Sequence, residues 1–328
     1  MFRFILRRTG SAVVLLLVLS AIIFVLQAVS PGDPVKAYLG ANASPEAIAA
    51  KREELGLNAP LYAQYLRFIA NLLHGDLGQS FRTHRPVLTD LQSFLPATLE
   101  LVLFSFVVAV LLGVLFAVSG SLRLMGGALF RGPLLLLAAA PPFLLALGGI
   151  VLFYAQLGVL PASGRGVDSS SPTGFVVLDS IITGQPDAIG LTFQHLLLPG
   201  VVLAIAPAIA IGRILRSSLD ATMSADYVRT AESKGLTPFA VLRRHVVRNS
   251  IGPGLSMAGL QLGFMFAGVV VVEQIFSWPG IGNYLAGSIP VSDFPAIAGV
   301  TLVLGTVYIV TNAVVDILQV AADPRLAA

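Results

Sequence analysis

Long apolar runs, almost free of charged side chains, recur along the chain. Six of them reach the length of a membrane span: Ser11–Val29, Leu101–Leu122, Pro133–Leu157, Leu191–Gly212, Pro253–Val272 and Phe294–Val320. A hydrocarbon core ~30 Å thick needs ~20 helical residues to cross it. Because hydrocarbon cannot hydrogen-bond the backbone, each run is expected to be helical. The pattern predicts an all-α integral membrane protein with six transmembrane helices.

The basic residues between these runs predict the orientation. Arg3, Arg7 and Arg8 precede the first run, Arg123 and Arg131 follow the second, and seven Lys or Arg lie between positions 213 and 248. The loops 158–190 and 278–293 hold one Arg against four Asp. Since cytoplasmic loops are enriched in Lys and Arg, both termini are expected to be cytoplasmic, in the cytoplasmic (inner) membrane.

The first 29 residues have an alternative interpretation as a cleaved signal peptide, because an Arg-rich start precedes an apolar run and small residues near Ala28. The run is longer than the ~7–15 residues of a signal sequence, and its loss would place the basic loops outside. An uncleaved first helix is the simpler prediction.

The segment 30–96 is the one long region expected outside the cytoplasm, and its six basic residues balance six acidic ones. Ser44 is placed to cap a helix that Gly56 ends. A second helix, Leu61–Leu73, aligns an apolar stripe of Tyr62, Tyr65, Leu66, Ile69 and Leu73. His74, Asp76 and His84 could contribute to a metal site, but without a fourth ligand a solvated loop is favoured, and no metal site is assigned.

Composition narrows the class of function. Hydrophobic residues make up 56% of the chain and charged residues 11%, Cys is absent, and the net charge is only +3. This balance excludes disordered and disulfide-stapled classes and does not suggest a nucleic-acid partner. The lysines are Lys36, Lys51 and Lys234, none preceded by Gly, so a P-loop ATP site is excluded.

Few ionisable residues lie in or beside the predicted spans: Glu100, His195, Glu273 and Asp316. A proton- or sodium-coupled carrier would need such groups near the middle of the membrane. All four are expected near span ends, where anchoring a helix or pairing with a neighbour is favoured over a relay. No nucleophile context stands out, so no catalytic residue is assigned.

The polar segment 213–252 is expected as a cytoplasmic loop of two short helices. Ser224 can cap the first, which runs to Lys234 and is closed by Gly235, and Thr237 with Pro238 opens the second. Tyr227, Val228 and Ala231 share one face of the first helix. Periodicity alone leaves two interpretations open: a plug into a groove, or a membrane-surface helix held by Arg243, Arg244 and Arg248 on anionic lipid.

This loop resembles that of the dipeptide/oligopeptide branch of ABC-importer permeases, the first of their two membrane subunits. The matching loop residues are Asp226-Tyr227-Val228-Arg229-Thr230-Ala231, Lys234-Gly235-Leu236, His245, Arg248-Asn249 and Pro253. Further matches are Pro31-Gly32-Asp33-Pro34, Leu55-Gly56-Leu57, Gly75-Asp76-Leu77-Gly78 with Ser80, Leu95-Pro96-Ala97-Thr98-Leu99-Glu100, Phe276-Ser277-Trp278-Pro279-Gly280 and Asp323-Pro324-Arg325. Glu232 and Gly252 depart from the branch, where a basic residue and Leu are more common.

The resemblance implies a type I ABC-importer permease fold with an extracytoplasmic insertion after the first helix. Its parts would be an N-terminal span 1–29, a cap 30–96, a five-helix core 97–320 containing the coupling loop 213–252, and a cytoplasmic tail 321–328. The implied ATPase-coupling helix comprises Asp226, Tyr227, Val228, Arg229, Thr230, Ala231, Glu232, Lys234 and Gly235. His245, Arg248, Asn249 and Pro253 would support the loop.

The same resemblance implies the partners. These are a second, homologous permease subunit in a heterodimer, two ATP-binding subunits that use ATP and Mg, and an extracytoplasmic solute-binding protein that delivers di- or oligopeptides. The chain itself would be no enzyme and bind no cofactor. Relatives in the branch are also linked to nickel complexes, glutathione and haem, so the substrate is the least specific implication. The alternatives are a self-sufficient secondary transporter or channel, and a membrane-embedded enzyme.

Overall fold

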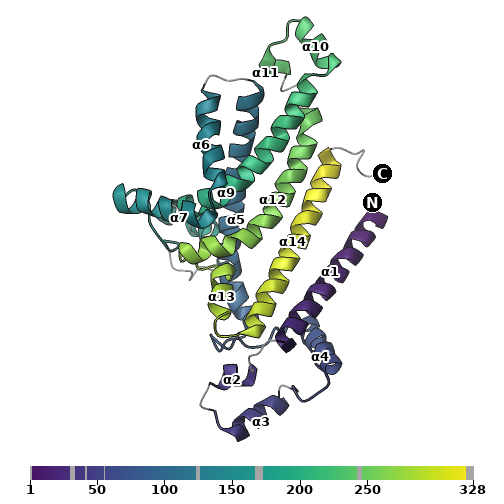
Figure 1. The fold of residues 1–328 in the computed structure, drawn as a ribbon, viewed down its shortest axis with the longest axis vertical. Helices are drawn as coiled ribbons and strands as arrows, with labels where there is room; N and C mark the ends of the chain where they lie inside the picture. The colour runs from purple at the N-terminus through teal and green to yellow at the C-terminus, as the bar shows by residue number, and fades with distance from the viewer. Residues whose placement is uncertain are drawn as a thin grey trace. The chain divides into compact units, whose positions relative to one another are not determined.

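The computed structural model describes residues 2–29, 34–40, 43–54, 56–122, 126–166, 173–241 and 246–322. Figure 1 shows a chain of helices, and the described residues contain no strand beyond an isolated bridge between Gln79 and Pro86. In chain order the elements are α1 (Phe2–Val29), α2 (Pro34–Leu39), α3 (Pro45–Glu54), α4 (Leu61–Leu73), α5 (Val87–Ser121), α6 (Gly127–Ala139), α7 (Pro142–Gly149), the π-helix η1 (Ile150–Gln156), α8 (Val176–Thr183), α9 (Pro186–Met223), α10 (Asp226–Ser233), α11 (Pro238–Val241), α12 (Val247–Ile275), α13 (Ile281–Ser288) and α14 (Phe294–Ala322).

Within the part of the chain that the structure describes, five helices are long and apolar enough to cross a membrane. Their apolar parts are Thr9–Val29, Val87–Ser121, Asp187–Met223, Asn249–Ile275 and Phe294–Ile317. A sixth span is formed if the bent pair Gly127–Ala139 and Pro142–Gln156 counts as one. The all-helical membrane class expected from the hydropathy pattern is therefore confirmed, with five or six spans.

The predicted continuous helix Pro133–Leu157 is wrong. The chain bends by 114° between α6 and the helical segment that begins with α7, and Figure 1 shows α7 turning sharply away from α6. Ala140 adopts an extended conformation (φ −83°, ψ 143°) directly before Pro141 and Pro142. The proline ring disfavours helical geometry in the preceding residue, and proline has no N–H to continue the helix.

Two predicted helix boundaries also need correction. The second span begins at Val87 rather than Leu101, because α5 runs through Pro96 without a break. The fourth continues to Met223, so α9 and α12 take up much of the segment 213–252 that was expected as loop. The remaining connection between α9 and α12 covers residues 224–246. Hydropathy marks only the apolar stretch of a helix, whereas the helix itself continues into polar sequence.

The chain divides into two compact units, and each is described by itself. Unit 1 contains residues 1–98 and 279–309, and unit 2 contains residues 99–278 and 310–328. The core of unit 1 joins the start of α5, α13 and α14 through Val87, Leu91, Ile281, Tyr284, Ala296 and Val300. A Cβ added to Gly299 would lie 2.6 Å from Cγ1 of Val87, so glycine permits this close packing.

Polar groups fix the ends of the unit 1 helices. Asp293 accepts hydrogen bonds from the Ser80 hydroxyl (2.5 Å) and from the backbone N–H groups of Arg82 (3.2 Å) and Ala296 (3.3 Å). The Ala296 bond caps α14, and the other two anchor the segment that contains the Gly75–Gly78 motif. The Thr98 hydroxyl accepts from the N–H of Ile281 (2.9 Å) and so joins α5 to the start of α13.

The cap contains the two predicted helices. The Ser44 hydroxyl accepts from the N–H of Ala47 (3.2 Å) at the start of α3, and Gly56 has φ +66°, which confirms both signals. The stripe predicted for α4 is wrong in part, because Tyr62, Leu66 and Leu73 are exposed. Phe68 and Leu72 instead pack with Leu19 and Ile23 of α1. The apolar arc of α4 is wide, so the neighbouring helix determines which part of it is packed.

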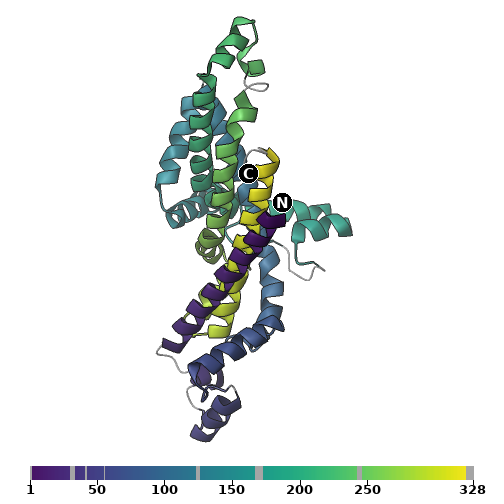
Figure 2. The same cartoon turned by 90° about the vertical axis from the view of Figure 1, so that its right-hand side faces the viewer.

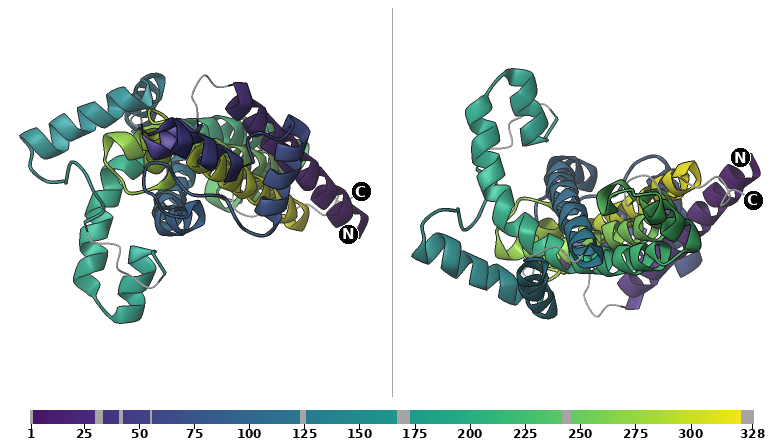
Figure 3. Two further views of the ribbon diagram at one scale, coloured as in Figure 1. Left: turned by 90° about the horizontal axis from the view of Figure 1, so that it is seen from below. Right: turned by 90° about the horizontal axis from the view of Figure 1, so that it is seen from above.

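Unit 2 is built around α9 and α12, which lie side by side (Figure 2). Glycines allow close approach: a Cβ on Gly113 of α5 would lie 2.9 Å from the Ala208 carbonyl of α9. Gly259 of α12 similarly faces Val315 of α14. Helix α8 lies beside the first turns of α9, as both views of Figure 3 show.

Candidate functional site: the helical connection between α9 and α12

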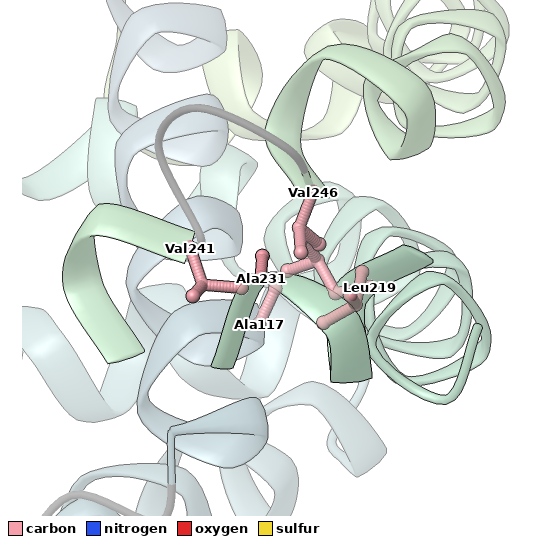
Figure 4. Close-up of a cluster of buried hydrophobic side chains, with 6 residues drawn as sticks. Ala117, Leu219, Ala231, Val241 and Val246 are labelled. Carbon is pink, nitrogen blue, oxygen red and sulfur yellow. The ribbon is translucent and has the colours of Figure 1, made fainter. Parts of the chain in front are cut away.

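The short helix α10 is seated on a buried hydrophobic cluster. Val228 and Ala231 of α10 pack with residues from three other helices and from the residue preceding α12: Ala117, Leu219, Val241 and Val246. Figure 4 shows these side chains converging from separate segments. Val228 has no solvent-exposed surface. Full burial of a Val side chain contributes roughly 1.5–3 kcal/mol, which holds α10 in one orientation at the ends of α5 and α9.

The outward face of α10 is polar and exposed. Arg229, Thr230 and Ser233 are exposed. The carboxylate of Asp226 lies 4.0 Å from the Arg229 guanidinium on the surface. A pair this exposed adds little stability. The orientation of this face therefore depends on the buried packing of Val228 and Ala231 rather than on the exposed pair of Asp226 and Arg229.

Tyr227 does not join the buried face, contrary to the prediction. Its side chain is 46% exposed, and its hydroxyl accepts a hydrogen bond from the Asn249 amide of α12 (3.3 Å). At about 100° per residue Tyr227 lies at the edge of the Val228–Ala231 face, and the phenol hydroxyl favours a polar partner. The bond joins α10 to α12.

The start of α10 also differs from the prediction. The Ser224 hydroxyl donates to the Asp220 carbonyl (3.0 Å) and so completes the last turn of α9 instead of capping α10. The Ala225 carbonyl accepts from the N–H groups of Val228 (3.0 Å) and Arg229 (3.3 Å). A serine hydroxyl can satisfy the preceding helix as readily as the following one, and the sequence does not distinguish the two.

The end of α10 and the start of α11 agree with the prediction. Gly235 has φ +79°, a left-handed conformation that other residues adopt only with strain. The Thr237 hydroxyl accepts from the N–H of Ala240 (3.3 Å) and caps α11. Phe239, a residue that the motif did not single out, is 65% exposed beside this turn.

The remaining predicted residues of the loop are placed unevenly. Pro253 is exposed within α12, where it cannot donate to the Asn249 carbonyl, and Lys234 is exposed at the end of α10. His245 lies outside the described residues, as do Arg243, Arg244 and the motifs at 31–33 and 323–325. The side chains of Glu232, Arg248 and the arginines at 3, 7 and 8 are likewise not described.

A second polar cluster in unit 2 supplies the partners of the buried Glu100 carboxylate. The Glu100 carboxylate is buried and accepts hydrogen bonds from the Arg165 guanidinium, one of them from Nε at 3.0 Å. It also accepts from the N–H of Val177 (2.9 Å). Pairing with a neighbour, the interpretation favoured over a relay, is thus found at Glu100. Its partner was not identified from sequence, since 65 positions separate the two residues.

The other motifs mainly shape turns. Trp278 and Phe276 are buried, Ser277 has φ +47°, and the Phe276 carbonyl accepts from the N–H of Gly164 (2.9 Å). Asp76 accepts from the N–H of Gly78 (2.8 Å) within its own turn. Among the residues that the structure describes, no three His, Asp or Glu side chains gather as a metal site would require.

Comparison with known proteins shows the family to which the chain belongs. Residues 105–328 match the family described as binding-protein-dependent transport system inner membrane component, and residues 1–102 match its N-terminal part. The chain belongs to this family. It is thus a membrane component of a binding-protein-dependent transport system, in keeping with its several spanning helices.

Several relatives align over nearly the whole chain. The probable D,D-dipeptide transport system permease protein DdpB of Escherichia coli is 38% identical, with 93% of this chain and 92% of the relative covered. The dipeptide transport system permease protein DppB of Alkalihalophilus pseudofirmus is 36% identical over 99% of each chain. The di/tripeptide transport system permease protein DppB of Pseudomonas aeruginosa is 37% identical, again over 99% of each.

Proposed function

We propose that this chain is a permease subunit of an ATP-driven importer and moves di- or oligopeptides that an extracytoplasmic binding protein delivers. The peptide substrate is supported by the dipeptide and di/tripeptide permeases that align over nearly the full chain. The observation that carries the mechanism is the seating of α10 on the cluster of Val228 and Ala231. A helix that is fixed to α5, α9 and α12 can transmit a push to all three.

In this mechanism α10 is the lever contacted by the ATPase. Its exposed Arg229, Thr230 and Ser233 form the contact face, and closure of two ATP-binding subunits displaces α10 as a rigid body. A second, homologous permease subunit completes the heterodimer and the path across the membrane. ATP and Mg bind to the partners, since no lysine of this chain follows a glycine as a P-loop requires.

The orientation of the chain in the membrane follows from the side on which α10 meets the ATPase. If α10 meets a cytoplasmic ATPase, then α11 and the connection 224–246 are cytoplasmic, and both termini lie on the same side, as the basic residues near the first span indicate. The cap containing α2, α3 and α4 then faces the binding protein. Deleting residues 44–73 without loss of uptake would remove this role of the cap.

The assembly is tested by co-purification. A tag after Ala328, mild extraction from native membranes and mass spectrometry should recover a related permease and P-loop ATPases. Thr230→Trp, on the exposed face of α10, should abolish ATPase recovery, because a large ring there blocks the contact without touching the buried seat. Ala49→Trp on the exposed side of α3 is the matched control and should leave ATPase recovery unchanged.

A secondary transporter is the outcome that would contradict the proposal. Recovery of the chain alone in several mild detergents, together with uptake that continues without ATP, would show that no ATPase drives it. The buried pairing of Glu100 with Arg165 speaks against this reading, because a coupling carboxylate must exchange its proton or ion during transport.

A further inference from the structure

Unit 1 contains an open cavity of about 510 Å³ between the cap, α1 and the first turns of α14. Helix α1 lines it at Phe24, α3 at Lys51 and Glu54, and α4 at Arg67, and the turn after α4 lines it at Asp76. The volume lies within the range of ~300–1,000 Å³ that small-molecule sites occupy. The cavity is therefore large enough for a ligand of dipeptide size.

The cavity is lined by equal numbers of positive and negative side chains, but not all of them form ion pairs. Lys51 donates to Glu54 (2.8 Å), and this hydrogen bond raises the pKa of Lys51, so its ammonium is charged at neutral pH. Arg67 forms no hydrogen bond or ion pair with any residue that the structure describes, although Glu54 and Asp76 line the same cavity. Opposite charges that line one cavity without meeting suit a ligand that carries both signs.

Gly56 leaves the space that the Arg67 guanidinium occupies. A Cβ added to Gly56 would lie 1.5 Å from Nη1 of Arg67, so any other residue at this position would displace the guanidinium. Gly56 also has φ +66°, which disfavours other residues independently. Glycine thus provides both the turn after α3 and the space in which the cation rests.

Aromatic rings form the apolar part of the wall. Phe24 and Phe68 lie 6.2 Å apart, centroid to centroid, and Tyr38 and Phe81 lie 5.8 Å apart in an edge-to-face arrangement. The Lys51 ammonium lies 4.9 Å from the centroid of the Tyr38 ring, and the Tyr38 hydroxyl donates to the Gln79 amide (3.1 Å). Rings beside paired and unpaired charges are suited to a zwitterion with an apolar side chain.

We propose that this cavity binds a small zwitterionic peptide before it enters the membrane part, with the peptide carboxylate on Arg67 and its ammonium directed to Glu54 and Asp76. The identification of the zwitterion as a peptide rests on the proposed function. The cavity is then a receiving site in the cap, occupied between release of the peptide from its binding protein and its entry into the membrane part.

Equilibrium dialysis of radiolabelled alanyl-phenylalanine against the purified complex in lipid nanodiscs, with no binding protein present, tests the site. Arg67→Gln should weaken binding by roughly 10- to 100-fold, the worth of a charge-assisted hydrogen bond. Lys36→Gln, which removes an equal charge from an exposed residue of the cap that does not line the cavity, should leave binding unchanged. The C-terminal amide of the dipeptide should bind wild type and Arg67→Gln equally.

Two outcomes would overturn the proposal. Unchanged binding by Arg67→Gln would place the peptide elsewhere in the complex. Competition by glycerophosphoethanolamine as strong as that by unlabelled peptide would identify a lipid-headgroup site instead. Co-purification of ATPases with Arg67→Gln separates this result from the proposed function, since the importer can assemble whether or not the cavity binds peptide.

Discussion

Arg165 and Glu100 form a buried ion pair within unit 2. The exposed fractions of their side chains are 2% and 8%, and Nη2 of Arg165 also donates to the Gly174 carbonyl (2.9 Å). The guanidinium lies 5.9 Å from the centroid of the buried Trp278 ring. One arginine thereby joins α5, the segment before α8 and the turn after α12.

Removal of one partner of this pair is expected to be more harmful than removal of both. Arg165→Leu leaves the Glu100 carboxylate buried without its counter-charge, which costs roughly 3–5 kcal/mol. The double variant Glu100→Gln with Arg165→Leu should recover part of this loss. Thermal unfolding of the detergent-solubilised proteins measures the three variants, and additive effects of the two single changes would contradict the coupling.

Gly235 is expected to matter for coupling rather than insertion. With φ +79°, Gly235→Val strains the backbone by roughly 1–2 kcal/mol or more and tilts the end of α10. ATP hydrolysis in the complex should continue while peptide uptake falls. Gly252→Val is the control, because Gly252 lies in α12 with no atom within 4 Å of its added Cβ. Normal uptake by Gly235→Val would remove the lever role from α10.

Packing between α12 and α14 is expected to be sensitive to a single methyl group. A Cβ on Gly259 would lie 2.3 Å from Cγ1 of Val315, so Gly259→Ala should destabilise the protein by roughly 1–3 kcal/mol through overpacking. Gly268→Ala, whose Cβ meets its nearest neighbour at 3.7 Å, should be tolerated. Adding Val315→Ala to Gly259→Ala should restore the unfolding temperature, and failure to do so would show that these two residues are not the cause.

Tyr284 predicts a pH dependence of stability above pH 10. Burial raises the pKa of Tyr284 to about 12. The Ser80 hydroxyl lowers this pKa, whereas the nearby Asp90 carboxylate raises it. Below pH 10 the phenol is neutral in both the folded and unfolded states. Between pH 10 and 12 only the unfolded chain ionises, so stability falls as pH rises.

The matched variant Tyr284→Phe isolates this titration from those of other groups. Its free energy of unfolding should fall less steeply than that of wild type between pH 10 and 12, and the two curves should run parallel below pH 10. Denaturant unfolding of the solubilised protein at each pH provides the measurement. Parallel curves over the whole range would show that the Tyr284 phenol titrates normally.

Much of the fold could be predicted locally. The apolar runs locate α1, α5, α9, α12 and α14, because a helix in hydrocarbon satisfies its backbone within its own segment. Local signals also predicted the caps at Ser44 and Thr237 and the left-handed glycine at 235, because each acts on residues only a few positions away. The break at Pro141 and Pro142 was also encoded locally, but hydropathy alone conceals it.

The membrane class, the family motifs and the approximate positions of five spans can be predicted from the sequence alone. The pairing of Arg165 with Glu100, the hydrogen bond between Tyr227 and Asn249, and the side of α4 that packs on α1 become evident only in the folded chain. Each depends on contacts between segments far apart in the chain. Periodicity names the candidate face of a helix, but the neighbour that covers it fixes which side chains are buried and which remain free for a partner.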